Sequence, residues 1–177
     1  MGTLKHILLV SLGLCSLAGF SQEKEAIPWA SDQKLQWDNF KATPPKDSRV
    51  AAITASGISY QFSAIEKNGR VELDCEIGTY FYPNESWYRP ETANPIILSH
   101  EQLHFDISEL FARQMRERIR EFSFTKNVKA EVKTIYGEIL MEMRDFQELY
   151  DRETNFSRNV EEQLRWNTEI AAALQEE

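Results

Sequence analysis

The turn Asn68-Gly69 separates two stretches, 50–66 and 70–82, in which apolar and polar residues alternate. Asn-Gly favours the two-residue turn of a β-hairpin. With these two residues as the loop, opposed positions add up to 137 and one face is apolar. The predicted pairs on that face are Phe62 with Cys75, Tyr60 with Ile77 and Ala64 with Leu73. The sequence predicts an antiparallel hairpin that packs on one face and is solvated on the other, with Cys75 as a buried structural thiol.

Three later stretches repeat their apolar residues every three or four positions, which is the helical period. They cover 95–122, 127–151 and 159–174. Residues 22–48 show no such period, and Trp29, Trp37 and Phe40 are their scattered apolar anchors. A hairpin followed by helices is typical of an α+β domain, so we expect the hairpin to pack on one long helix, beside a second antiparallel long helix and a C-terminal helix.

Residues 1–21 have the pattern of a secretory signal, with Lys5 ahead of an apolar run that is too short to span a bilayer. We therefore expect a single domain at 22–177 that is exported to the periplasm, the cell envelope or the medium. Loss of Lys5 with the leader changes the formal net charge from −8 to −9. An acidic chain without basic runs is a poor nucleic-acid binder, and no further segment is apolar enough for membrane insertion. The oligomeric state cannot be read from the sequence.

The first long helix contains His100-Glu101-Gln102-Leu103-His104. Residues four apart lie on one face of a helix, so both imidazoles can bind one ion. Imidazole suits zinc, and Glu101 can act as the general base toward a zinc-activated water. These are the only histidines after the leader. The motif predicts a Zn²⁺ site with ligands His100 and His104 and a catalytic Glu101.

A catalytic zinc usually has three protein ligands, and no third histidine follows the leader. If the long helices fold back on each other near Thr125, facing positions add up to about 249, which places Asp145 near His104. The candidate third ligands on or after the second helix are Glu142, Asp145, Asp151 and Glu153. Each is otherwise an ordinary solvated acid, and the sequence does not choose among them.

The sequence resembles a bacterial domain family of unknown function whose members are labelled predicted secreted zinc-dependent proteases. The segments that carry the resemblance are 35–40 with Pro44-Pro45, the hairpin, Ser86-Trp87, 100–107, 150–154, Gln163 and Trp166. The resemblance implies a zincin-like fold in which His100 and His104 bind zinc and Glu101 is the general base. The family pattern also has a histidine two residues after Thr154, where this chain has Phe156.

These observations favour a zinc metallopeptidase that hydrolyses a peptide or protein substrate with zinc-activated water. Phe156 keeps a second hypothesis open, a catalytically degenerate relative that binds a peptide or protein partner. A third hypothesis gives His100 and His104 a structural role only, as a two-point metal staple or as core residues. The substrate's identity depends on pockets that the sequence does not describe.

Overall fold

The structure, a computed structural model, describes residues 25–175 and contains the predicted hairpin, although its first strand begins at Ser56 and not at residue 50. Strands β3 (Ser56–Lys67) and β4 (Arg70–Phe81) pair antiparallel, and Asn68 and Gly69 adopt the positive φ angles, 53° and 74°, that their turn requires. All predicted pairs are confirmed, including Phe62 with Cys75. The leader 1–21 lies outside the described residues.

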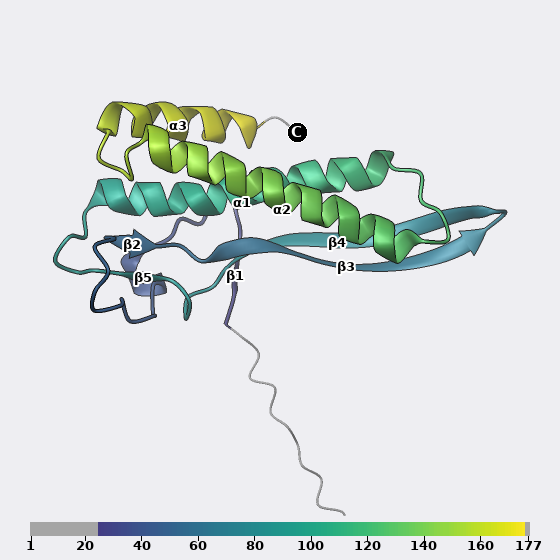
Figure 1. Cartoon of the computed structure of the whole chain (residues 1–177), viewed down its shortest axis with the longest axis horizontal. Helices are drawn as coiled ribbons and strands as arrows, with labels where there is room; N and C mark the ends of the chain where they lie inside the picture. Colours follow the sequence, from purple (N-terminus) through teal and green to yellow (C-terminus); the bar gives the residue numbers. More distant parts are fainter. Residues whose placement is uncertain (1–24, 176–177) are drawn as a thin grey trace, which may run out of the picture.

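The apolar face of the hairpin is covered unevenly. Ile58, at the base, is 5% exposed, whereas the turn end of the ribbon extends past the helices (Figure 1). Cys75 is half-buried, so the prediction of a buried thiol was wrong, because the helices cover this part of the ribbon only in part. Even this partial burial, together with the charge of Asp74, raises the pKa of the Cys75 thiol.

The three helices lie where the apolar periods predict them. They are α1 (Pro95–Glu121), α2 (Val128–Glu153) and α3 (Val160–Ala173). Asn94 caps α1 by accepting hydrogen bonds from the amides of Ile96 and Ile97, and Pro95 takes the first helical position, where its missing N–H costs nothing. No helix within 25–175 is long and apolar enough to cross a membrane.

Helix α1 is the centre of a mixed α+β arrangement. It packs against β3 and β4 on one side and against α2 and α3 on the other (Figure 1). The main core therefore lies on both sides of α1, and its members include Ile107 and Met115 of α1, Ile139 of α2 and Ile170 of α3. Because each neighbour contacts α1, the side chains of this helix set the relative positions of the other elements.

The N-terminal segment and the short strands also cover α1. Strand β1 (Ile27–Pro28) extends the hairpin sheet next to β4, and β2 (Ala52–Ile53) pairs with β5 (Trp87–Tyr88) in a second small sheet. A 3₁₀ turn, Trp37–Asn39, lies between β1 and β2 in the sequence. The second core is formed by Leu35, Phe40, Phe81 and Phe105, with Trp29 and Trp37 packed on it, so the predicted aromatic anchors do anchor this segment.

Asp106 fastens the N-terminal segment to α1. Its Oδ1 accepts hydrogen bonds from Trp29 Nε1 (2.8 Å) and Gln102 Nε2 (2.9 Å), and its Oδ2 pairs with Lys34 Nζ at 3.2 Å. The Gln102 side chain in turn accepts a hydrogen bond from the Leu35 amide at 2.7 Å. A buried carboxylate needs such partners, because removing an unpaired charge from water costs folding free energy.

Asp106→Ala should destabilise the protein by about 2–4 kcal/mol, since it leaves the part-buried Trp29 indole and the buried Gln102 amide without their acceptor. Urea unfolding followed by tryptophan fluorescence measures the change. Glu72→Ala is the control: its pairing with Lys67 at 3.8 Å is exposed, so the change should stay within about 0.5 kcal/mol. An unchanged urea midpoint for Asp106→Ala would contradict the anchoring role.

Candidate metal centre

His100 and His104 lie on the same face of α1, as their spacing predicts. Their Nε2 atoms are 3.3 Å apart, and their rings meet edge to face. His100 is 5% exposed, and the His104 side chain is 14% exposed. Two imidazole nitrogens therefore point to one place that is nearly closed to solvent.

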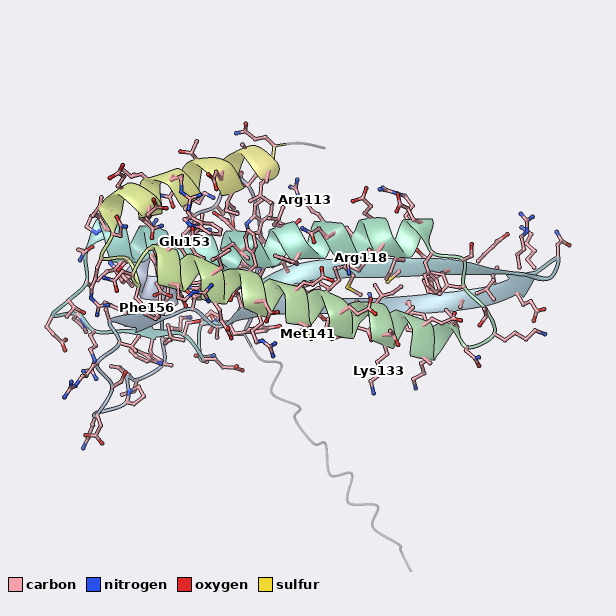
Figure 2. The ribbon with its side chains drawn as sticks, turned by 45° about the horizontal axis from the view of Figure 1, so that its top comes forward. Arg113, Arg118, Lys133, Met141, Glu153 and Phe156 are labelled. Atoms are coloured by element: carbon pink, nitrogen blue, oxygen red, sulfur yellow. The ribbon has the colours of Figure 1, made fainter. Side chains whose placement is uncertain are left out.

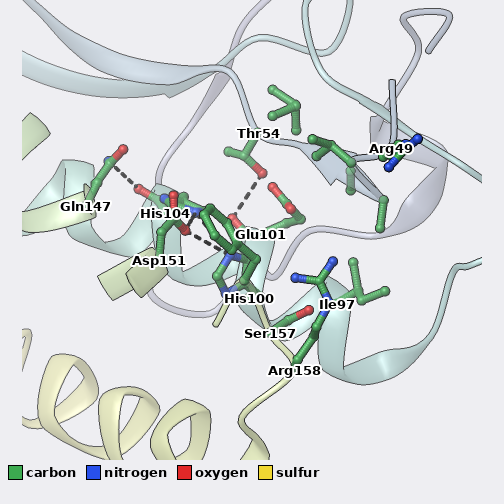
Figure 3. Close-up of a pocket in the computed structure, with 15 residues that line it drawn as sticks. Arg49, Thr54, Ile97, His100, Glu101, His104, Gln147, Asp151, Ser157 and Arg158 are labelled. Carbon is green, nitrogen blue, oxygen red and sulfur yellow. Dashed lines mark hydrogen bonds and ion pairs between the residues drawn. The ribbon is translucent and has the colours of Figure 1, made fainter. Parts of the chain in front are cut away.

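Asp151, near the end of α2, completes the group. Its Oδ1 lies 3.1 Å from His100 Nε2 and 3.0 Å from His104 Nε2 (Figure 3). Within residues 25–175 these three side chains form the one His/Cys/Asp/Glu group whose ligand atoms come close enough to share an ion. Four ligands at the 2.0–2.1 Å typical of tetrahedral zinc stand about 3.3 Å from one another, so the observed separations fit that geometry.

The other predicted third ligands lie away from the histidines. Glu142 forms an exposed ion pair with Arg118, and Asp145 forms one with Arg144. Glu153 lies on α2 close to α3 (Figure 2) and accepts hydrogen bonds from Arg165 and Trp166 of that helix. Of the four acids, the structure brings only Asp151 to His100 and His104.

The predicted helix register was close, but Asp145, the acid that it placed near His104, does not lie there. Gln147 donates to the carbonyl of His104 and the Tyr150 hydroxyl to that of His100, so contacting positions add up to about 250, as expected. Helical side chains lean toward the N-terminus of their own helix, which brings Asp151 back toward His104. Asp145 is about 240° around α2 from Asp151, at 100° per residue, and faces solvent.

Gln163 of α3 orients the His100 ring. Its Oε1 accepts a hydrogen bond from the Tyr150 hydroxyl (2.9 Å) and lies 3.0 Å from His100 Nδ1, while its amide donates to Asn167. The acceptor beside Nδ1 requires the proton of a neutral His100 to sit on Nδ1, so Nε2 carries a lone pair directed at Asp151 and His104. Such a second hydrogen bond is usual for a metal-binding imidazole.

No pattern in the sequence assigned Gln163 or Tyr150 a role at the site, although both lie in segments that carry the family resemblance. The available signal was a polar residue at an apolar position: Gln163 falls on the stripe of α3 that also contains Trp166 and Ile170, and it is 2% exposed. A polar side chain on a buried stripe needs a partner, and here that partner is His100.

Charge at the cluster favours an anionic Asp151. Burial alone would raise the pKa of Asp151, but hydrogen bonds and positive charge from His100 and His104 hold it well below its ordinary value. For His104, burial alone would lower the pKa, but Asp151 and Glu101 outweigh that effect and raise it. A carboxylate and two imidazoles that meet in this way attract positive charge, whether a proton or a metal ion.

The cluster opens into a cavity of about 520 Å³. Glu101 lines this cavity beside the histidines, and the Thr54 hydroxyl donates to its backbone carbonyl at 3.1 Å, which ties β2 to α1 (Figure 3). The other residues that line it are Arg49–Ile53, Ile97, Gln147 and Phe156–Arg158. A substrate in this cavity would lie against both Glu101 and the His/Asp cluster.

The loop between α2 and α3 carries strain next to the site. Asn155, Phe156 and Ser157 all have left-handed φ angles, 48°, 52° and 70°. This conformation costs roughly 1–2 kcal/mol for a residue with a side chain, although asparagine tolerates it better. The Phe156 amide donates to the Asp151 carbonyl at 2.9 Å, so the strained loop closes directly onto the helical turn that carries Asp151.

Phe156, where the family resemblance implies a histidine, also lines the cavity. Its side chain is 58% exposed. A side chain at this position therefore reaches the mouth of the site, while Asp151 lies at the cluster itself.

The protein is therefore of the α+β class and has a His/Asp cluster near the N-terminal end of its central helix. Residues 32–158 match the model of a bacterial protein family of unknown function, DUF922. The chain belongs to this family, which confirms the resemblance at that level. No curated protein sequence and no solved structure matches the chain.

Proposed function

We propose that this protein is a zinc-dependent hydrolase, with His100, His104 and Asp151 as metal ligands and Glu101 as the catalytic base. The observation that carries the proposal is the triangle of acceptor atoms: two imidazole nitrogens and a carboxylate oxygen lie 3.0–3.3 Å apart. Without a cation or an extra proton, three lone pairs would face one another at hydrogen-bond distance. A metal ion satisfies all three.

The donor set favours zinc among the common metals. Two imidazoles and one carboxylate suit zinc, whereas calcium and magnesium prefer oxygen ligands throughout. Three protein ligands leave a fourth position for water or substrate, which distinguishes a catalytic site from a closed structural one. We also propose that the arrangement is zincin-like, with the motif-bearing helix packed beside a sheet.

A peptide bond is the bond that we propose is cleaved. When bound, zinc would supply a Lewis acid and lower the pKa of a water molecule. Glu101 takes a proton from the attacking water as the new carbon–oxygen bond forms. It then returns that proton to the leaving nitrogen as the carbon–nitrogen bond breaks. The leader pattern of residues 1–21 supports an activity outside the cytoplasm.

Peptide binding without turnover is the second candidate, and Phe156 at the family's histidine position favours it. If that histidine is needed for catalysis, this chain would retain the cavity but not the chemistry. Asp151 weighs against this candidate, because it supplies a third ligand atom.

Purified residues 22–177 should hold close to one zinc per chain after dialysis, as measured by elemental analysis. His100→Ala and Asp151→Ala should hold almost none, because each removes one of three ligands. Asp145→Ala should match the wild type, since Asp145 faces solvent. Wild-type zinc content in Asp151→Ala would contradict the assignment of the third ligand.

Glu101→Gln should keep its zinc and lose hydrolysis of a quenched fluorescent peptide library by about 10²–10⁴-fold, the usual contribution of a general base. Equal zinc content in the two proteins shows that the site is intact. Zinc-loaded wild type that cleaves no peptide in the library would favour the binding module instead.

Gln163→Leu should weaken zinc affinity about 10–100-fold, because His100 loses the acceptor that orients it. Competition with a fluorescent chelator measures the affinity. Gln114→Leu is the matched control, because it lies on α1 about 15 Å along the axis from His104 and should bind zinc like the wild type. If Gln163→Leu folds, as shown by its melting temperature, and binds zinc with wild-type affinity, the positioning role is wrong.

A further inference from the structure

Two arginines lie on the rim of the cavity that contains the cluster. Arg49 precedes β2 and Arg158 follows the strained loop, so segments far apart in the sequence bring both guanidinium groups to one cavity (Figure 3). Both residues are exposed. The acids of the cavity lie deeper: Glu101 is 5% exposed and the Asp151 side chain 28%.

Neither rim arginine is neutralised within residues 25–175. Arg158 donates one hydrogen bond, to the carbonyl of Asn155 at 3.3 Å, and neither residue forms an ion pair with a described acid. Other arginines do: Arg118 pairs with Glu142, and Arg165 with three glutamates. In a chain of formal charge −8, two cations without acidic partners at a cavity mouth offer a binding site for a carboxylate.

The same rim is unusually apolar. Val50, Ile53 and Phe156 line the cavity and are 48%, 41% and 58% exposed. A neighbouring cavity shares Ile97, Ser157 and Arg158 with the first. The apolar surface continues there through Ile96 and Val160, which are 36% and 43% exposed. Large exposed apolar groups that gather around a cavity are typical of a binding surface.

We propose that the cavity selects peptide segments in which a carboxylate accompanies a bulky apolar side chain. Arg49 and Arg158 bind the carboxylate, and the apolar side chain packs on Val50, Ile53 and Phe156. The carboxylate comes from an Asp or Glu side chain or from the peptide's C-terminus. As a statement about a hydrolase substrate this rests on the proposed function, but the recognition itself requires no turnover.

Fluorescence anisotropy with labelled peptides tests the selection. The protein is residues 22–177 with Glu101→Gln, zinc-loaded and metal-free, so that no probe is consumed. The probes are otherwise identical decapeptides that contain Phe-Glu, Phe-Gln or Ala-Glu, each with an amidated or a free C-terminus. We expect Phe-Glu to bind about tenfold more tightly than Phe-Gln or Ala-Glu, and less tightly at high salt.

Combining Arg49→Gln with Arg158→Gln should bring the Phe-Glu to Phe-Gln ratio close to one. Arg70→Gln is the matched control, because Arg70 lies next to the hairpin turn and also forms no ion pair with a described acid, so its ratio should stay at about ten. Preference for a free over an amidated C-terminus would identify the terminal carboxylate as the group that is bound. Equal binding of all probes, absence of binding, or a preference that survives the double substitution would overturn the proposal.

Hydrolysis by the zinc-loaded wild type separates the two proposals. Cleavage of Phe-Glu and Phe-Gln peptides with equal kcat/KM would leave the hydrolase standing and overturn the selection. A binding preference that depends on the two arginines, without cleavage of any peptide, would support the selection and overturn the hydrolase.

Discussion

The polar side chains of α1 constrain the rest of the structure, because this helix is covered on nearly every side and each of its buried polar groups needs a partner. The partners come from different elements. Asp106 takes Trp29 and Lys34 from the N-terminal segment, and Glu109 accepts from Thr79 of β4. The remaining contacts are Ser108 with Ser56 of β3, His100 with Gln163 of α3, and both histidines with Asp151 of α2. One helix thus fixes the placement of the hairpin, both later helices and the N-terminal segment.

The His/Asp cluster differs from these other polar contacts. Asp106 and Glu109 face donors, whereas at the cluster two imidazole nitrogens and a carboxylate oxygen face one another, and Gln163 holds the His100 proton on the far side of its ring. Three acceptors in a nearly closed place favour a cation. The left-handed residues Asn155–Ser157 cost stability beside the same cluster. Strain of this kind gathers at functional sites, where the surrounding structure holds it.

The sequence predicted well those features of the fold that depend on residues close together in the chain. The Asn-Gly turn set the complete hairpin register, and apolar periodicity located all three helices, with ends within two residues. Predictions failed where the outcome depended on how far one element covers another. Cys75 is half-buried because the ribbon extends past the helices. Asp145 does not lie beside His104, because the predicted register gives a level along the helix but not a direction around it.

The sequence alone determined the histidine pair and the adjacent Glu101, since residues four apart on a helix share a face in any tertiary context. For the third side chain beside the two histidines, the sequence offered four acids and did not choose among them. The tertiary structure places Asp151 beside the histidines, because the packing of α1 against α2 decides which side chain reaches them. It also brought Gln163 to His100, and Arg49 and Arg158 to one rim. These contacts join segments tens of residues apart, and only the packed chain sets such distances.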